Sequence, residues 1–409
     1  LDFAELQAER QIPMKMADWV TRLDAFLQFN EYIQKLWLSK WGIYKITFAI
    51  FICFSFIYFP EILVKRITGE WSINDQLVQN FVNLKIKSPF TPYLNAEKWD
   101  HFSKRDLRIT PYLIGKIFHL EAIKLFYFQA FILFPLFIYL SLKTINKFIK
   151  DEIIAFWGTL ALLFSYVGNS FNYDTFFFDS YAYTGLLAAL YWNNKWFAIP
   201  ILIATFFVDE RSIIPASLIF ISSYFSSKQD ETTTWKTQLV RLILNNASFW
   251  HYCIAVFIYV AIRIALFKNF GLSTPVGNDA GVTLGLAFIH KFKVPFAIFS
   301  AFKLNFILIF VTIYTLTKSK ELLVNLAYLT LLILILLTST AVEDVTRSLG
   351  FGFLLILAFY QLAASLESDK KNLRLFCALI SLSNLLLPTY TLLLQLYQIP
   401  ILGWVNLFG

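Results

Sequence analysis

The segment Phe206-Phe207-Val208-Asp209-Glu210-Arg211-Ser212-Ile213-Ile214-Pro215 places three consecutive ionisable residues between two apolar runs, 196–208 and 213–225. A charge near hydrocarbon is unfavourable unless it is paired or hydrated, so charges at a membrane edge are functional candidates. The segment also fits a polar hairpin tip, in which Asp209 caps the next helix and Arg211 faces lipid phosphates. Similar clusters recur at other ends of apolar runs, which favours a shared site.

The composition predicts an all-α polytopic membrane protein. The chain has 409 residues, of which 58% are hydrophobic and 15% are charged, and its mean hydropathy is +0.60. A soluble domain has about 45–50% apolar and about 25% charged residues. The apolar residues form runs near the length of about 20 residues that crosses the hydrocarbon core. We expect about eleven such helices, at 46–64, 122–142, 152–169, 179–193, 196–208, 212–226, 247–267, 294–317, 321–340, 347–366 and 373–396.

Charge and metal-ligand residues exclude several classes of function. The net charge of +8 needs no nucleic acid to explain it, because the lysines lie mainly in short loops where they meet lipid headgroups. Cys53, Cys253 and Cys377 fall inside apolar runs without disulfide or metal spacing. The four histidines are scattered, so no metal site of histidine type is predicted. Membrane lipids are the expected partners, and the sequence does not indicate an oligomeric state.

The loops divide into two chemical classes when the N-terminus is placed in the cytoplasm. The cytoplasmic loops then carry basic residues, as the positive-inside bias requires, namely Lys143, Lys147, Lys150, Lys195, Lys228, Lys236, Arg241, Lys318, Lys320, Lys370, Lys371 and Arg374. The opposite face receives carboxylates together with arginines, namely Asp75, Asp100, Arg105, Asp106, Arg108, Asp174, Asp179, Asp209, Glu210, Arg211, Glu343, Asp344 and Arg347. We expect these helix ends to surround one polar cavity.

The long first outer loop, 65–111, contains further helices. The apolar spacing of Leu77, Val78, Phe81 and Val82 predicts a helix that lies in the membrane interface. Arg105 and Arg108 stand at the opening of a helix that runs toward residue 118, where their guanidinium groups suit a phosphate. The alternative is that these cations only extend to lipid headgroups.

This layout resembles the membrane-embedded glycosyltransferases of the C superfamily from about residue 44 onward. The resemblance implies a polyprenyl-phosphate-linked sugar donor, an acceptor that is a glycan, lipid or protein, and transfer on the outer face of a bacterial inner (plasma) membrane. It implies a catalytic carboxylate in the first loop at Asp75 and one in the second loop at Asp174 or Asp179. The charged tip adds Asp209 and Glu210 as catalytic candidates. The resemblance implies that Arg105, Arg108, Arg211 or Arg347 binds the donor phosphate. Asp344, close to Arg347 in the sequence, is a further substrate-binding candidate. No cofactor motif is recognisable, although some relatives use a divalent metal, which carboxylates hold through oxygen.

The first residues form a different segment, and we divide the chain into a cytoplasmic amphipathic helical segment, 1–43, and a multipass domain, 44–409. The phrases LDFAELQAER (1–10) and MADWVTRLDAFL (16–27) resemble the C-terminal tail of RhuM-like virulence proteins. The resemblance covers residues 1–32 and implies a fused fragment; an ordinary amphipathic helix is the alternative.

Two other functions are consistent with the sequence. A transporter or flippase of a polar lipid or glycan predicts discontinuous helices and charges near the bilayer midplane. A polysaccharide polymerase or ligase uses chemistry close to that of the glycosyltransferase. Each acidic residue also has a structural alternative, because Asp75 and Asp344 stand where helix caps are expected.

Overall fold

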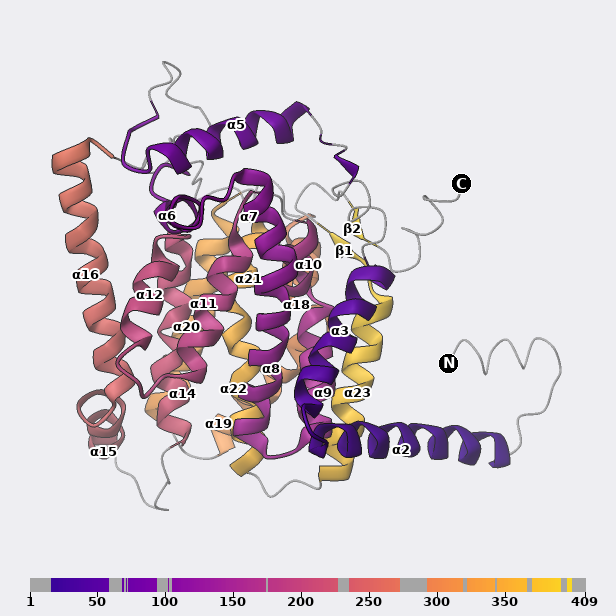
Figure 1. Cartoon of the computed structure of the whole chain (residues 1–409). Helices are drawn as coiled ribbons and strands as arrows, with labels where there is room; N and C mark the ends of the chain where they lie inside the picture. Colours follow the sequence, from indigo (N-terminus) through magenta and orange to yellow (C-terminus); the bar gives the residue numbers. More distant parts are fainter. Residues whose placement is uncertain are drawn as a thin grey trace.

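The computed structural model describes residues 16–58, 68, 69, 71, 73–93, 102, 105–173, 176–226, 235–272, 293–318, 322–342, 344–365, 370–390 and 396–398. Within these ranges the chain is helical apart from one small antiparallel pair of strands, in agreement with the expected all-α class. The helices form an upright bundle with α2 lying across one end and α5 across the other (Figure 1).

The first part of the chain supplies the two helices that lie across the ends and the first long helix of the bundle. The elements are α2 (Met16–Leu38), α3 (Gly42–Tyr58), α5 (Ile73–Lys87), α6 (Ile109–Ile117), α7 (Ala122–Phe128), the π-turn η2 (Gln129–Leu133) and α8 (Phe134–Ile149). The predicted interfacial helix is therefore present as α5. Its Phe81 and Val82 are buried against the bundle, while Leu77 on the same helix is exposed.

The middle of the chain forms short helices and one long peripheral helix. The elements are α9 (Glu152–Leu163), α10 (Tyr166–Tyr173), α11 (Asp179–Tyr191), α12 (Ala198–Phe206), the 3-10 turn η3 (Glu210–Ser212), α13 (Ile213–Ala216), α14 (Leu218–Ser226), α15 (Trp235–Leu239), the π-turn η4 (Val240–Leu244) and α16 (Ala247–Phe270). Helix α11 is central and buried on all sides, as a helix that is apolar all round requires. A Cβ on its Gly185 would meet the Thr205 side chain of α12, so glycine lets these helices approach closely.

The last part of the chain completes the bundle. The elements are α18 (Val294–Phe302), α19 (Asn305–Lys318), α20 (Leu322–Thr340), α21 (Val345–Gly350), the 3-10 turn η6 (Phe351–Phe353), α22 (Leu354–Ser365), α23 (Lys370–Leu386), β1 (Thr389–Tyr390) and β2 (Leu396–Gln398). The predicted last crossing, 373–396, is wrong in its second half, because the helix ends at Leu386. Pro388 follows after Leu387, and proline disfavours helical geometry in the residue before it.

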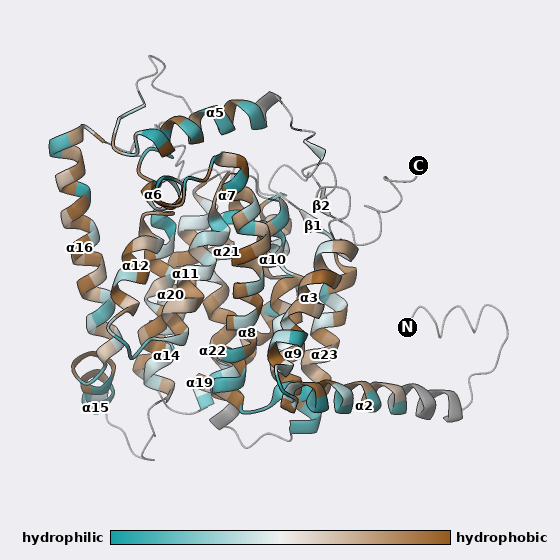
Figure 2. Ribbon diagram, viewed as in Figure 1, coloured by the Kyte–Doolittle hydropathy of each residue, from teal (hydrophilic) through white to brown (hydrophobic). Residues whose placement is uncertain are grey.

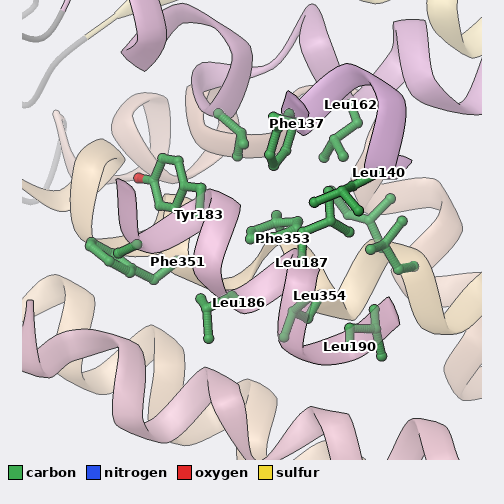
Figure 3. Packing of buried hydrophobic residues seen from close by; sticks show 14 of the residues in the cluster. Phe137, Leu140, Leu162, Tyr183, Leu186, Leu187, Leu190, Phe351, Phe353 and Leu354 are labelled. Atoms are coloured by element: carbon green, nitrogen blue, oxygen red, sulfur yellow. The ribbon is translucent and has the colours of Figure 1, made fainter. Parts of the chain in front are cut away.

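The core is one continuous apolar cluster that runs through the bundle. In Figure 3, side chains of α8, α9, α11 and the η6–α22 segment interlock around Phe137, Leu187 and Phe353. Figure 2 shows hydrophobic residues along the length of the bundle and hydrophilic ones on α5 and α15 at its ends. Helix α16 stands at one edge (Figure 1) and exposes Phe257 and Phe267. Exposed apolar side chains along a helix of this length are consistent with a membrane environment.

Four helices are long and apolar enough to cross a membrane, or up to six if each of two bent pairs counts as one span. The bent pairs are α9 with α10, at 68°, and α18 with α19, at 83°. Several apolar helices can therefore span a membrane. The expected number of about eleven stays a prediction, since α11 has 13 residues and α12 has nine.

The N-terminal segment does not stand apart from the bundle where it is described. Trp157 of α9 donates a hydrogen bond from Nε1 to Asn30 Oδ1 of α2 at 3.0 Å, and Ile33 is buried. Residues 1–15, on which much of the RhuM-like resemblance rests, lie outside the described residues. The division at residue 43 stays a prediction.

The two ends of the bundle differ in charge. We call one the arginine end, after Arg105, Arg108, Arg211 and Arg347, and the other the lysine end, after Lys147, Lys150, Lys370, Lys371 and Arg374. Helix α11 joins them: Asp179 at its start contacts three of the arginines, and the carbonyl of Tyr191 at its finish accepts a hydrogen bond from Lys147.

Candidate functional site

Arg108 connects three separate elements of the arginine end. It precedes α6, and a 3.2 Å ion pair between Lys85 and Asp106 fastens the turn before it to α5. Its Nη1 donates to the carbonyl oxygen of Phe177 at 2.6 Å, and its Nη2 lies 2.8 Å from Asp209 Oδ2. Arg108 of the first loop therefore contacts Asp209, which lies between α12 and η3.

The Asp209-Glu210-Arg211 tip is both a helix start and part of an ion-pair network. Asp209 Oδ1 accepts from the backbone N–H of Arg211 at 3.0 Å, as the capping alternative predicted. The same carboxylate also binds the Arg211 guanidinium through Nε at 2.8 Å and Nη2 at 2.7 Å. Arg211 Nη1 in turn donates to Ser348 Oγ of α21 at 2.6 Å. The tip is thus joined to the last third of the chain.

Asp179 lies at the centre of the arginines. It is the first residue of α11, and its side chain is fully buried. Its carboxylate oxygens lie 3.2 Å from Arg347 Nε, 3.5 Å from Arg211 Nη2 and 3.9 Å from Arg108 Nη1. Neither oxygen accepts a well-directed hydrogen bond from any described residue. Three guanidinium groups therefore surround the Asp179 carboxylate, but none of them donates a well-directed hydrogen bond to it.

A strained turn supplies the aromatic wall of the site. Phe176 and Phe178 both have φ of 63°, in the left-handed region that residues with a side chain rarely adopt. Both side chains are buried, which holds the turn in place. The ring of Phe177 between them lies 4.2 Å from the Arg347 guanidinium and 4.5 Å from that of Arg105. The strained backbone of this turn places the Phe177 ring against Arg105 and Arg347, and its carbonyl oxygen against Arg108.

Arg105 differs from the other arginines because it has no carboxylate partner among the described residues. It is 4% exposed, and its Nη1 has no hydrogen-bond partner there. The nearby Asp106 carboxylate is occupied by Lys85 and by the backbone N–H of Tyr93. Burial, followed by the charge of Arg108, lowers the pKa of Arg105, and the more distant Asp179 carboxylate offsets only part of this effect. A buried cation that no carboxylate contacts directly is unfavourable unless a ligand completes it.

Positive charge is in excess at this end. The cluster contains Arg105, Arg108, Arg211 and Arg347 against Asp179, Asp209 and the half-exposed Asp344, which pairs with Arg347 at 3.2 Å. Burial by itself raises the pKa of the Asp209 carboxyl, but the guanidinium groups of Arg211 and Arg108 outweigh burial and hold that pKa well below its usual range. The arrangement suits an anion, and phosphate matches the fork of guanidinium donors best.

The other predicted residues lie around this cluster. Glu210 turns away from it and pairs with Arg263 of the peripheral helix α16. Asp75 lies in the first turn of α5. Asp174 lies outside the described residues. The structure thus brings together Asp209, Asp344 and all four predicted arginines.

Sequence reasoning weighed Asp179 only as an alternative to Asp174, and it did not single out Phe177 or Ser348. Asp179 carries a signal that favours it, since it is the acid that directly begins an apolar helical run and can share in the positive end of that helix. Phe177 and Ser348 carry none, because their roles depend on contacts between segments far apart in the chain.

The described residues contain no group of three or more histidine, cysteine, aspartate or glutamate side chains placed to hold a metal ion. Comparison with known protein-family models, with curated proteins and with solved structures finds no match.

Proposed function

We propose that the chain is a membrane glycosyltransferase of the C-superfamily type, which moves a sugar from a polyprenyl-phosphate-linked donor to an outer-face acceptor. The observation that carries the proposal is Arg105, a buried cation that no described carboxylate balances, beside three further arginines. A donor phosphate would supply the missing negative charge. A membrane location suits a donor whose lipid part stays in the bilayer.

The chemistry assigned to the arginines is stabilisation of the leaving group. In the transfer, the acceptor hydroxyl oxygen forms a bond to the anomeric carbon, and the bond from that carbon to the phosphate oxygen breaks. The electron pair leaves with the phosphate, whose negative charge grows as the bond breaks. Fixed guanidinium groups in a site shielded from water stabilise such developing charge strongly.

The proton of the acceptor hydroxyl goes to a carboxylate, and we assign this role to Asp75. Helix α5 lies across the arginine end (Figure 1), and Trp71 just before it packs against Phe176 with ring centroids 5.6 Å apart. The start of α5 is therefore fixed beside the strained turn. Asp209 is a weaker base, because the guanidinium groups of Arg211 and Arg108 hold its pKa well below the usual range.

Asp209, Asp179 and Asp344 are then positioning residues, which orient the arginines rather than contact the reacting atoms. Glu210 fastens α16 to the site through Arg263. We further propose that the short helices also cross the bilayer, which gives about eleven crossings. The N-terminus and the lysine end then face the cytoplasm of a bacterium.

The test is transfer from radiolabelled polyprenyl-phosphate sugars by the purified chain, resolved by thin-layer chromatography. Wild type is expected to turn over at least one donor. Arg105→Gln should lower the rate by about 100-fold or more, as loss of one donor to a developing oxyanion does. Asp75→Asn should lower it by about 100-fold or more, as loss of a general base does.

The matched control is Arg241→Gln, the same change in the short helical segment η4, which should leave the rate unchanged. Absence of turnover by the wild type with every donor would overturn the proposal. Turnover that survives Arg105→Gln would remove the phosphate role of this arginine.

A transporter is the second candidate, and the two bent helix pairs favour it. Discontinuous helices with buried polar groups at the break are typical of secondary transporters. Lys303 stands at the bend between α18 and α19, fully buried, and donates to the carbonyl oxygens of Asn384 and Leu387 at 3.0 and 2.6 Å. Asn305 ties the same bend to the Ala161 carbonyl of α9, the other bent helix. Movement of the labelled lipid-linked sugar between leaflets of proteoliposomes, without transfer, would favour this function.

A further inference from the structure

A pocket with apolar and charged walls lies at the lysine end, at the other end of the bundle from the arginines. It is formed by α2, which lies across this end (Figure 1), by the start of α9 and by the first turns of α23. Its volume is about 230 Å³, with Phe26, Leu27 and Leu375 among its apolar residues. It suits a headgroup rather than a whole lipid.

One wall of the pocket is cationic. Helix α23 begins with Lys370 and Lys371 and has no acidic residue in its first turn, although helix N-termini ordinarily favour acids. Lys371 and Arg374 both line the pocket. Arg374 uses Nε and Nη2 to bind Asp151, at 3.0 and 2.7 Å to Oδ2, so its guanidinium is held in a fixed orientation. The positive end of the helix and these cations together favour a phosphate.

The opposite wall carries an acid. Glu31 of α2 lines the pocket, and its carboxylate is 4.0 Å from Lys35 on the same helix. Both side chains are largely exposed, so this pairing contributes little and leaves the carboxylate able to bind another cation. Asn30 and Gln34 add amide groups. A ligand that fits both walls carries a phosphodiester and a positive group together.

An apolar stripe leads away from the pocket along α23. Leu375 lines the pocket, and Leu379, Leu382 and Leu386 follow it at helical spacing, all four of them exposed by 42–72%. Residues three and four apart share one face of a helix, so these leucines form a continuous surface from the lysine end toward the arginine end. A free phosphate or a sugar phosphate makes no use of this stripe, whereas an acyl chain covers it.

We propose that the α2–α23 pocket binds one phospholipid whose headgroup carries both a phosphodiester and a primary ammonium group. The phosphate lies at Lys371 and Arg374, the ammonium at Glu31, and an acyl chain runs along the leucine stripe. This site is independent of the proposed transferase activity, because it lies at the other end of the bundle and shares no residue with the arginine cluster.

The experiment is native mass spectrometry of the full chain in a neutral detergent, with phosphatidylethanolamine, phosphatidylglycerol and phosphatidylcholine of the same acyl chains added at equal concentration. Wild type is expected to retain one phosphatidylethanolamine in preference to the others. Lys371→Gln should lower the retention of that lipid by about tenfold, the effect of one charge-assisted hydrogen bond. Leu375→Trp fills the pocket without a change of charge, and it should lower the retention of all three lipids.

Glu31→Gln is the most specific variant. It should remove the preference for phosphatidylethanolamine over phosphatidylglycerol and leave phosphatidylglycerol retained as before. Lys143→Gln is the matched control, since Lys143 lies on α8 and does not line the pocket. Unchanged melting temperatures would show that each variant is folded.

Equal losses in Lys143→Gln and Lys371→Gln would mean that lipids are attracted only by the general charge of this end, and the proposal would fall. A preference that survives Glu31→Gln would contradict the ammonium contact. Displacement of the lipid by inorganic phosphate at millimolar concentration would identify a phosphate site instead of a lipid site.

Discussion

Two buried aspartates, each at the start of a helix, show how differently the two ends are built. Asp151 at the lysine end accepts hydrogen bonds from the backbone N–H groups of Ile153 and Ile154 at 3.1 and 3.0 Å, and from Arg374 through two nitrogens. Asp179 at the arginine end faces three guanidinium groups at 3.2–3.9 Å and accepts no well-directed hydrogen bond from the described residues.

The comparison distinguishes a structural ion pair, at Asp151, from a candidate anion-binding site, at Asp179. One acid, one arginine and a helix start complete each other at Asp151, so the carboxylate itself has no acceptor capacity left over. At the arginine end four arginines face three acids, and none of the three arginines around Asp179 makes a well-directed hydrogen bond to it. An incoming anion can therefore take up guanidinium donors that the protein does not use fully.

The largest effect is expected at the shared acid. Asp179→Ala would leave Arg108, Arg211 and Arg347 in mutual repulsion inside the bundle. Removal of one partner from a buried ion pair lowers the free energy of unfolding by about 3–5 kcal/mol. Thermal unfolding of the purified variant in detergent would measure it. Asp151→Asn keeps a side-chain oxygen for the helix cap, so it should lower the free energy of unfolding by less. An equal decrease in both variants would mean that the two aspartates do not differ in role.

Two arginine substitutions should act in opposite directions. Arg374→Gln leaves the Asp151 carboxylate buried without its cation and should lower the free energy of unfolding by about 2–3 kcal/mol. Arg105→Gln removes a buried charge that no described carboxylate balances, so it should leave stability unchanged or raise it while transfer is lost. Melting temperatures of both variants, measured side by side, provide the check. Destabilisation by Arg105→Gln as large as that by Arg374→Gln would show that Arg105 is structural.

The pH dependence of stability should show that Asp209 stays ionised. Its pKa is lower in the folded chain than in the unfolded chain. Its ion pairs therefore contribute stability that is fully present above the unfolded pKa of about 3.9 and is lost as the pH falls through the lower, folded value. The difference in melting temperature between wild type and Asp209→Asn should be constant from pH 7 to about pH 5 and shrink below that. A difference that already shrinks near pH 6 would contradict the arginine contacts.

The smallest effect is expected at Lys150, one of two strained backbone positions that can be compared between the ends. Lys150 closes α8 with φ of 51°, and glycine adopts this geometry without a steric penalty. Lys150→Gly should raise the free energy of unfolding by about 0.5–1 kcal/mol. Phe178→Gly relieves similar strain at the arginine end, yet it removes a buried ring and should destabilise by about 3–5 kcal/mol. Denaturant titration of the two variants would compare them; stabilisation by Phe178→Gly would mean that the turn is not held by its buried rings.

The sequence carried enough information for the helices and for the partners at the arginine end. Apolar runs located α5, α8 and α16, and the recurrence of acids beside arginines predicted that Arg108 and Asp209 meet, although they are about 100 positions apart. The argument works because only paired or hydrated charges are tolerated at a membrane edge. The number and sign of the charges at each helix end therefore restrict which helix ends can pack together.

The bends and the aromatic wall were not predictable in the same way. Apolar character continues through both breaks, so hydropathy joined α9 to α10 and α18 to α19 into single runs. The second bend depends on Lys303, whose partners lie about 80 residues away at the end of α23. Phe177 becomes part of the site only because its two neighbours adopt left-handed backbone geometry. Such features arise from tertiary packing, which no local pattern records.

The shortness of α11 has a consequence for the distance between the two polar ends. Its 13 residues span about 20 Å, against a hydrocarbon thickness of about 30 Å. Asp179 stands at one terminus, and the Tyr191 carbonyl at the other accepts a hydrogen bond from Lys147. Because neighbouring helices cover α11 on all sides, these opposed charged groups are separated by packed protein and not by lipid.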